Sequence, residues 1–398
     1  MKKVVIVGGG FSGLILANSL KTKKIDFLLI EKNDRVGKKI LATGNGRCNF
    51  TNQYLSEECY HEGQKGFSAY AIKKFDNQAI EGFFKNLGVL STVENGKVYP
   101  ASLLANSILD ALRLALLGEE VLTSSKVVDI KKSGNIFSVK LDNGDIINAE
   151  NVVLAFGGKA GSQFGTDGSS YTLATNFGHK LTKLYPSLVQ MKCESQAVKG
   201  LKGIKQKAKV ELYNGNKFIK STYGDLLFAD NGVSGNAVFY LSSYLGSADK
   251  PSLIVDLVPD YNAEEIFASL QNKVKAFPNI TGDKLLNGVV ASRLSTKIAT
   301  ELEIHGKKLC ELSNQKINLA IERVKKYRIV VTGTLGFNNA QVTSGGIETS
   351  YVDNKTFESK LAPGLYIIGE ALDVDGDCGG YNLQFAFSSA MCVSEAIE

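Results

Sequence analysis

Three glycine-rich stretches, far apart along the chain, combine small residues with polar side chains in a way that suits a charged ligand. They run from Gly8 to Gly13, from Gly44 to Asn49 and from Gly379 to Gln384. Glycine lets the backbone come close to a ligand, so that its N–H groups can donate hydrogen bonds to phosphate or to a developing negative charge. The three stretches therefore predict contact with one extended ligand, and a dinucleotide fits that description.

The elements around the first stretch are those that a dinucleotide site needs. Val4–Val7 is an unbroken apolar run, typical of a buried strand, and apolar residues recur at helical spacing after the glycines. A second apolar run, residues 27–30, predicts the next strand, which ends at Glu31. An acid at an offset of about 20 residues binds ribose hydroxyls in dinucleotide-binding folds. We therefore expect a strand–turn–helix–strand unit over residues 1–31, with Glu31 on the ribose.

Length and composition limit the class of protein. A chain of 398 residues supports two or three domains, and its 44% hydrophobic and 22% charged residues are those of a globular protein. The net charge of +6 suits an anionic ligand and is too small to argue for nucleic acid by itself. The apolar N-terminus is interrupted by glycines, and no apolar run reaches the roughly 18 residues of a membrane helix. We expect a cytoplasmic protein with no membrane partner.

The middle of the chain predicts further elements. Amphipathic helices are expected over residues 71–87 and 102–117, and a β-meander over residues 126–131, 136–141 and 146–149, followed by a separate strand over residues 151–155. Helical segments are expected over residues 263–275, 283–304 and 313–325, and a last helix from about Leu383. A different domain inserted into a nucleotide-binding domain is therefore predicted.

Three alternating lysines in the inserted part have two interpretations. Lys205, Lys207 and Lys209 fall on one face of a predicted strand, opposite Ala208 and Val210. We interpret them as the solvated face of that strand, because half-buried antiparallel strands expose one polar face. A nucleic-acid-binding patch is the alternative interpretation. We do not expect a nucleic-acid partner, but this alternative stays open.

The motifs together resemble a known family, the bacterial BaiN-type or aminoacetone-oxidase-like FAD-dependent flavoproteins of the two-dinucleotide-binding-fold superfamily. The resemblance covers essentially the whole chain. Its most specific parts are residues 37–52 and 364–384, and shorter similar stretches are residues 226–235, 256–259 and 342–347. Ala229, Asp230 and Asn231 stand where the family commonly has a Thr-His pair before glycine. We therefore carry no relative's substrate over to this chain.

The resemblance implies an α/β fold with a glutathione-reductase-like FAD-binding domain of Rossmann type, an inserted β-rich domain and a helical subdomain. The FAD-binding domain is expected to be discontinuous, over residues 1–190 and 336–398. The β-rich substrate domain is expected over residues 191–260 and 326–335, and the helical subdomain over residues 261–325. FAD is the implied, tightly held cofactor.

The resemblance also implies which residues line the FAD. The nucleotide end would be held by Gly8, Gly10, Phe11, Ser12, Gly13, Glu31 and Lys32, with Val128 near the adenine. The diphosphate, ribityl chain and flavin ring would be lined by Lys38, Lys39, Gly44, Asn45, Gly46, Arg47, Cys48, Asn49, Ala155, Gly157, Gly158, Gly345, Glu370, Asp373, Gly380, Tyr381, Asn382, Leu383 and Gln384. No residue is predicted as a catalytic acid or base.

Cysteines and histidines add little to this chemistry. The six cysteines show no C-x-x-C spacing, and His61, His179 and His305 are scattered, so we expect free thiols and no metal. Cys48 and Cys378 both lie in segments assigned to the flavin, which raises the alternative of a redox disulfide. Disulfide-reducing flavoenzymes use two closely spaced cysteines on one helix, a pattern that this sequence lacks.

The predicted activity is that of an FAD-dependent oxidoreductase acting on a small organic molecule. We expect a reductase of an activated double bond or carbonyl, with NADH or NADPH as a possible transient donor, because no second dinucleotide fingerprint follows a strand. A flavin-dependent amine oxidase that uses oxygen and a flavin-containing RNA-modifying protein are the alternatives. The sequence assigns neither a substrate nor an oligomeric state.

Overall fold

The computed structural model describes residues 1–246 and 248–397, and the chain forms two compact units. Unit 1 comprises Met1–Ser187 and Phe337–Glu398, and unit 2 comprises Leu188–Gly336. Each unit has its own buried core, built from strands such as Val4–Val7 in unit 1 and from residues such as Val210 and Leu253 in unit 2. The finer division of the chain into three domains stays a prediction.

Unit 1 is built around a seven-stranded sheet. Its strands are ordered β7 (Val121–Leu122), β2 (Phe27–Ile30), β1 (Lys2–Val7), β10 (Ile146–Leu154), β9 (Ile136–Leu141) and β8 (Val127–Ser133), and β19 (Leu365–Ile367) also pairs with β10. The β1, β2, β7, β10 and β19 pairings are parallel, whereas β8, β9 and the start of β10 form the antiparallel meander. The α/β class and the Rossmann-type domain are confirmed.

Strand β10 corrects the prediction of two strands, 146–149 and 151–155. It is one strand whose first residues pair with β9 and whose last residues pair with β1 and β19. Exposed Asn148 and Glu150 interrupt the apolar pattern, which led to the predicted break. The backbone ladder continues through them, because Ala149 and Asn151 both pair with β1.

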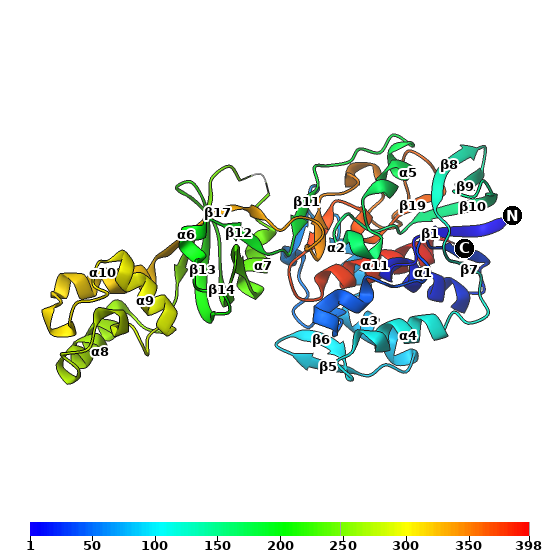
Figure 1. The fold of residues 1–398 in the computed structure, drawn as a ribbon. Helices are drawn as coiled ribbons and strands as arrows, with labels where there is room; N and C mark the ends of the chain where they lie inside the picture. Colours follow the sequence, from blue (N-terminus) through cyan, green and yellow to red (C-terminus); the bar gives the residue numbers. More distant parts are fainter. Residues whose placement is uncertain (247, 398) are drawn as a thin grey trace. The chain divides into compact units, whose positions relative to one another are not determined.

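Two largely buried helices lie against each other in unit 1. Helix α1 (Phe11–Thr22) packs against the last helix, α11 (Tyr381–Ala396), and the hydroxyls of Ser19 and Ser394 are 2.7 Å apart (Figure 1). Helix α4 (Ala105–Leu114) also contacts α1. The first and last segments of the chain therefore build one core, as the late return of nucleotide-binding motifs predicts.

The predicted helix over residues 71–87 is two helices, α2 (Ala69–Lys74) and α3 (Asn77–Asn86). Asp76 separates them, because its carboxylate accepts hydrogen bonds from the N–H groups of Gln78 and Ala79, both at 3.0 Å, and so caps α3. The other elements of unit 1 are short: η1 (Ile40–Gly46), β3 (Thr51–Asn52), η2 (Glu57–Cys59), β4 (Tyr60–Glu62), β5 (Ser91–Glu94), β6 (Lys97–Pro100), η3 (Ser162–Phe164), η4 (Ser169–Tyr171), α5 (Thr172–Thr175), β11 (Tyr185–Ser187), β18 (Val342–Ser344), η7 (Thr349–Tyr351), η8 (Gly369–Ala371) and β20 (Val374–Gly376).

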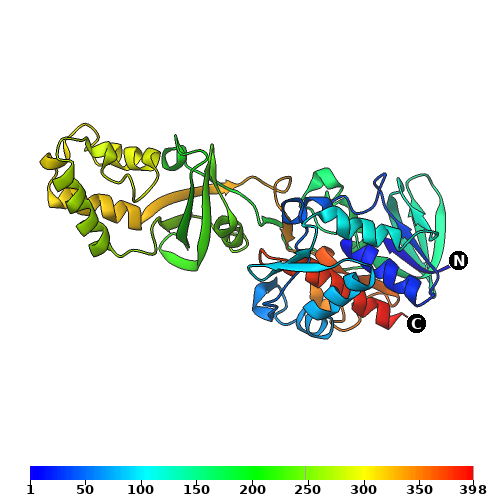
Figure 2. The same cartoon turned by 90° about the horizontal axis from the view of Figure 1, so that it is seen from below.

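Unit 2 contains a closed barrel and a group of helices. The barrel strands are β12 (Met191–Cys193), β15 (Gly232–Ser234), β14 (Lys217–Ala229), β13 (Lys205–Asn214), β16 (Pro251–Asp256) and β17 (Tyr327–Thr334). The helical elements are α6 (Ser195–Val198), α7 (Asn236–Ser242), α8 (Ala263–Ala276), η5 (Gly282–Lys284), α9 (Ser292–Glu301), η6 (Leu309–Glu311) and α10 (Asn314–Lys325). Helices α8, α9 and α10 gather at one end of the barrel (Figure 2). The β-rich insert is confirmed.

The predicted helix over residues 283–304 is wrong in its first half. Only Ser292–Glu301 forms an α-helix, preceded by the short η5 turn and an irregular segment. Gly288 has a φ of +94°, which an α-helix excludes, and Asn287 forms a bridge to Val290.

Among the described residues, no helix is both long and apolar enough to cross a lipid bilayer.

Candidate functional site

The glycines at the start of α1 differ in how much space their surroundings leave for a side chain. A Cβ atom on Gly13 would lie 2.0 Å from the carbonyl oxygen of Gly8, and one on Gly8 would lie 2.5 Å from that of Ala155. A Cβ on Gly10 would meet no heavy atom within 4 Å. Gly10 is also the N-cap of α1 and provides no side-chain acceptor for the first turn. Packing explains Gly8 and Gly13, whereas the open space beside Gly10 fits a diphosphate at the helix N-terminus.

Glu31 lies beside this turn at the end of β2. Its side chain is buried, and its Oε2 accepts a 2.8 Å hydrogen bond from the N–H of Gly9. Its Oε1 accepts hydrogen bonds from the N–H and the Nδ2 of Asn33, at 2.8 and 2.6 Å. The segment between β7 and β8 also contacts this residue, because the N–H of Ser125 donates a 3.1 Å hydrogen bond to the Glu31 carbonyl oxygen. Val128, 42% exposed, follows at a bulge in β8.

A second group of predicted residues meets around Glu370 in η8. Lys39 Nζ lies 2.7 Å from Glu370 Oε2, and Glu370 Oε1 accepts a 2.9 Å hydrogen bond from the N–H of Thr343. A Cβ on Gly158 would lie 2.7 Å from the same carboxylate. The neighbouring Gly369 approaches Ser12, since a Cβ there would lie 3.0 Å from the Ser12 hydroxyl. Segments that are far apart in sequence therefore converge near the start of α1.

Three of the residues predicted to bind FAD have contacts with other parts of the protein and not with the group around Glu370. Lys32 pairs with Asp167 at 3.2 Å, and Lys38 pairs with Asp34 at 2.5 Å, in both cases with a carboxylate that is more than half exposed. Gly345 has a φ of +87°, and a Cβ there would lie 2.5 Å from the carbonyl oxygen of Lys183. Surface ion pairing and backbone packing account for these positions. Their predicted contacts with FAD stay predictions.

The C-terminal motif also contains a buried carboxyl group that the sequence did not single out. Asp375 is 2% exposed, and within the part of the chain that the structure describes its Oδ2 has no hydrogen-bond partner. Burial, helped by nearby Asp373 and Glu370, raises the pKa of Asp375 to about 7, although His61 and the Ser344 side chain oppose the shift. Burial also raises the pKa of Asp373. The signal was the Asp373, Asp375, Asp377 alternation, which places carboxylates on one face of an extended segment.

The third glycine stretch forms the start of α11 rather than a loop before it. The helix begins at Tyr381 instead of Leu383, so Tyr381 to Gln384 lie in its first turn. Gly380 has a φ of +103°, and a Cβ there would lie 2.4 Å from the carbonyl oxygen of Thr51. As the N-cap it leaves the first turn without a side-chain acceptor. Backbone N–H groups are therefore free of side-chain caps at a second helix N-terminus.

Side chains in this first turn hold the structure around it. Asn382 exchanges two 2.8 Å hydrogen bonds with the backbone of Gly376. Gln384, fully buried, accepts from the Thr51 hydroxyl at 2.5 Å and donates to the Phe75 carbonyl at 2.7 Å. These two side chains are occupied by the protein itself. The Tyr381 hydroxyl likewise donates to the Tyr54 carbonyl at 3.3 Å. Any contact of this turn with a flavin is therefore left to the backbone and to half-buried Leu383.

The second glycine stretch lies next to the third. Asn52, which follows it, donates from Nδ2 to the Gly379 carbonyl at 2.8 Å. Left-handed backbone recurs along the stretch, with positive φ at Gly44, Asn45, Gly46 and Cys48. Such a run of positive φ values holds a tight, irregular backbone that glycine favours.

Arg47 and Cys48 within this stretch have distinct environments. Arg47 Nη2 lies 2.6 Å from a Glu94 carboxylate oxygen, and its guanidinium lies 4.2 Å from the ring centroid of Tyr99. Glu94 raises the pKa of Arg47, so this cation is already compensated. Cys48 is fully buried, which raises the pKa of its thiol to about 12 and disfavours the reactive thiolate. All six cysteines are free, and the described residues contain no group of three or more potential metal ligands.

Comparisons with known proteins agree with the motif-based resemblance. Residues 2–396 match the family model described as HI0933-like protein Rossmann domain. The chain is 33% identical over 405 residues to a 3-dehydro-bile acid delta(4,6)-reductase of Clostridium scindens, covering 100% of this chain and 99% of that protein. It is 28% identical over 403 residues to a ribosomal RNA dihydrouridine synthase of Escherichia coli, covering 98% and 96%. The resemblance to BaiN-type flavoproteins is confirmed.

The fold is also similar to that of a solved structure. A 3-ketosteroid delta1-dehydrogenase from Sterolibacterium denitrificans, crystallised with 1,4-androstadiene-3,17-dione, superposes with a TM-score of 0.51. The alignment covers 99% of each chain at 14% identity. At that identity the similarity concerns the fold alone.

Proposed function

Because the chain belongs to the HI0933-like family and is an FAD-dependent oxidoreductase, we propose that it reduces a carbon–carbon double bond conjugated to a carbonyl group in a small organic substrate. The observation that carries this proposal is its full-length similarity to two relatives with different substrates. Dihydrouridine is uridine whose ring double bond, conjugated to a carbonyl, has been reduced. A delta(4,6)-reductase of a 3-dehydro compound acts on double bonds conjugated to a ketone. Both names therefore describe the same kind of reaction, the reduction of a carbon–carbon double bond conjugated to a carbonyl group.

FAD, when bound, supplies the hydride for such a reduction. The start of α1, with open space beside Gly10, would hold its diphosphate, and Glu31 would lie at the adenosine ribose. The start of α11 would direct backbone N–H groups and the positive end of the helix toward the flavin ring, where negative charge gathers on reduction. These roles are supported by the uncapped N-termini of both helices.

The reaction also needs a proton for the second carbon of the double bond. Among the carboxyl groups around Glu370, Asp375 is the one whose burial raises the pKa to about 7, and no described residue forms a hydrogen bond with its Oδ2. A carboxyl group with that pKa still carries a proton at neutral pH in an appreciable fraction of molecules. We therefore assign Asp375 as the candidate group that holds this proton.

The hydride on FAD must come from a donor, and we propose NADH or NADPH. The sequence has no second dinucleotide fingerprint after a strand. A nicotinamide would therefore reach the flavin transiently, without a domain of its own. A cytoplasmic location fits this donor and the six free cysteines.

Reduction of uridine in RNA is the second candidate function. It is favoured by the E. coli relative, whose similarity extends over nearly the whole chain at 28% identity. The two candidates share the chemistry at the flavin and differ in the size of the substrate.

The test begins with the purified protein loaded with FAD under anaerobic conditions. Bleaching of the flavin absorbance by NADH or NADPH supports a reductase. Bleaching by an amine, followed by peroxide formation in air, would instead support an oxidase. A protein that takes up no FAD would contradict the proposal at its base. Adding a 3-keto-Δ4 steroid or a uridine-containing RNA to the reduced enzyme then separates the two candidates.

A further inference from the structure

The positive charge of this protein is concentrated in unit 2. Its residues, 188–336, contain 21 lysines and arginines and 14 aspartates and glutamates, a net charge of +7. The rest of the chain contains 25 and 26 such residues, a net charge of −1. The dinucleotide motifs all lie in the unit with the negative balance, so binding of the anionic FAD does not account for the excess. Another anion is the simplest reason for it.

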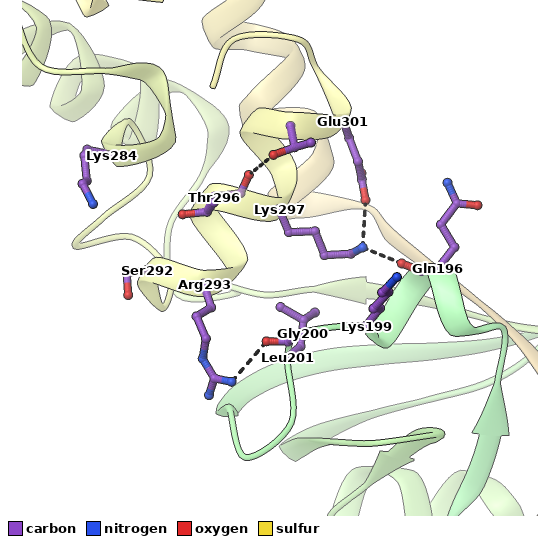
Figure 3. A pocket seen from close by; sticks show the side chains of 11 residues that line it. Gln196, Lys199, Gly200, Leu201, Lys284, Ser292, Arg293, Thr296, Lys297 and Glu301 are labelled. Atoms are coloured by element: carbon purple, nitrogen blue, oxygen red, sulfur yellow. Dashed lines mark hydrogen bonds and ion pairs between the residues drawn. The ribbon is translucent and has the colours of Figure 1, made fainter. Parts of the chain in front are cut away.

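A pocket in unit 2 collects some of this charge. It has a volume of about 670 Å³ and lies between α6, with the segment that follows it, and one face of α9. Its charged and hydroxyl-bearing lining includes Lys199, Lys284, Ser292, Arg293, Lys297 and Glu301. We name it the Lys199–Arg293 pocket. Figure 3 shows Arg293 and Lys297 reaching from α9 toward the segment that carries Gln196 and Gly200.

Two of its four cations are neutralised by carboxylates and two are not. Lys297 lies 3.5 Å from Glu301, and Lys284 lies 3.3 Å from Asp283. Arg293 bonds only to neutral groups, the carbonyl oxygens of Gly200 at 3.1 Å and Lys202 at 2.9 Å. Lys199 is exposed, and over residues 1–246 and 248–397 neither Lys199 nor Arg293 takes part in an ion pair.

The fixed position of Arg293 matters for recognition. Its two carbonyl contacts hold the guanidinium in place without cancelling its charge, and so it is preorganised for an anion. Ser292, exposed beside it, adds a hydroxyl donor. A planar guanidinium, a hydroxyl and a lysine are the donors that proteins use for phosphate oxygens.

Further exposed lysines lead away from the pocket. Lys202, Lys205, Lys207 and Lys209 follow along the loop and strand β13, and Lys202 also provides one of the carbonyls that hold Arg293. Lys202, Lys205 and Lys209 have carboxylate partners, whereas Lys207 has none among the described residues. With Lys199 and Arg293, Lys207 gives three cations that have no carboxylate partner among the described residues. An anion with several charges in a row can contact more of them than a single small anion can.

We propose that the Lys199–Arg293 pocket binds phosphate groups, and that its occupant is the phosphate backbone of RNA. The inference does not rest on the proposed reductase activity, because unit 2 would bind phosphate whether or not the flavin turns over. It assigns a role to the alternating lysines that the sequence left as a solvated face. A small phosphorylated molecule carries the same recognised group, and the experiment separates it from RNA.

The experiment uses the full FAD-loaded chain and a short fluorescein-labelled single-stranded RNA, followed by fluorescence anisotropy over a range of salt concentrations. We expect Lys199→Glu to weaken binding at least about tenfold. It should also lower the slope of log affinity against log salt by about 0.7, the value for one lost phosphate contact on single strands. No described residue forms a hydrogen bond or an ion pair with the Lys199 side chain, so this variant should fold, which its FAD spectrum and thermal unfolding will check.

The matched control is Lys217→Glu, which changes the net charge by the same amount. Lys217 is exposed at the start of β14, at the far end of the β13–β14 hairpin, roughly 30 Å along the strand from the pocket. It should leave RNA affinity within about twofold of the unaltered chain. Equal losses in both variants, or no binding of RNA at low salt, would overturn RNA as the occupant.

Inorganic pyrophosphate identifies the recognised group. If it displaces the RNA, and Lys199→Glu weakens it too, phosphate recognition in the pocket is supported. If calorimetry shows that pyrophosphate binds through Lys199 while RNA does not bind, the pocket is a site for a small phosphorylated molecule and the RNA occupant is wrong. If neither probe binds, the phosphate site itself is wrong.

Discussion

The two units of this protein place their charged groups in opposite ways. Unit 1, with a net charge of −1, buries carboxyl groups such as Glu31 and Asp375 beside its glycine stretches. Unit 2, with a net charge of +7, keeps most of its lysines exposed, on the barrel strands, the helices and the loops between them. The average of +6 over the whole chain hides this division. Buried carboxyl groups indicate a site built for one ligand, whereas an exposed excess of positive charge indicates attraction to a polyanion.

The largest effect is expected from substitutions in the glycine turn of unit 1, where one glycine is needed for packing and another for binding FAD. Gly13→Ala would force a Cβ to 2.0 Å from the Gly8 carbonyl oxygen, so we expect the apoprotein to lose about 3 kcal/mol or more and to retain no FAD. Gly10→Ala is the matched control, because its Cβ meets no protein atom. It should unfold within about 0.5 kcal/mol of the unaltered chain and yet bind FAD more weakly. Thermal unfolding and FAD titration measure the two properties, and normal FAD affinity in Gly10→Ala would contradict the assignment of this turn to the diphosphate.

The next effect concerns the buried carboxyl of Asp375. Its folded-state pKa of about 7 lies above the ordinary 3.8, so the protonated form stabilises the fold below about pH 4 and that contribution is lost as pH rises toward 7. Asp375→Asn should therefore stabilise the apoprotein at pH 8, by at most about 4 kcal/mol, and have little effect at pH 4.

Chemical denaturation of both proteins at the two pH values measures this difference. Glu150→Asn, at a half-exposed carboxylate of the same unit, should show no such pH dependence. A stability gain for Asp375→Asn that is equal at pH 4 and pH 8 would show that the carboxyl is not perturbed in the fold. In the holoenzyme, the same variant should slow substrate reduction and leave flavin bleaching by the nicotinamide unchanged.

A smaller effect is expected at the ribose end. Glu31→Gln keeps the size of the side chain but removes the charge and one acceptor for the Gly9 and Asn33 N–H groups. We expect FAD affinity to fall about tenfold, corresponding to about 1.4 kcal/mol. FAD titration of the apoprotein measures it, and unchanged affinity would remove Glu31 from the cofactor site.

The smallest effect is expected on the barrel surface. Lys205 pairs with Asp225 at 2.8 Å, but the lysine is 64% exposed, so Lys205→Ala should change the free energy of unfolding by no more than about 0.5 kcal/mol. A loss of 2 kcal/mol or more, on the scale expected for buried groups, would show that the basic face of unit 2 is structural and would weaken the contrast between the units.

The sequence predicted what depends on local pattern. The strand Phe27–Ile30, the glycine turn and the discontinuous course of unit 1 follow from apolar runs and motif order. The break between α2 and α3 was missed because Phe75 continues the apolar stripe, and only the cap by Asp76 ends it. The helix over 283–304 was overextended because nothing in the local pattern shows that Gly288 has a positive φ, which ends any helix there.

The candidate site shows the same limit. Convergence of Lys39, Gly158 and Glu370 was expected from the resemblance, whereas the burial of Asp375 depends on the pairing of β20 with β4, which no local pattern gives. Conversely, Asn382 and Gln384 were assigned to the cofactor, and their side chains hold backbone instead. The charge division between the units could be seen only once the boundaries of unit 2 were known.

In the proposed reaction, the reduced flavin delivers its hydride to a conjugated double bond. The most direct measurement is anaerobic stopped-flow reoxidation of the photochemically reduced holoenzyme by a 3-keto-Δ4 steroid, with its saturated 3-ketone as the control. We expect return of the oxidised flavin spectrum with the unsaturated compound, formation of the saturated product, and no reoxidation by the control. Reoxidation by oxygen alone, with no response to any conjugated ketone or to uridine-containing RNA, would contradict it.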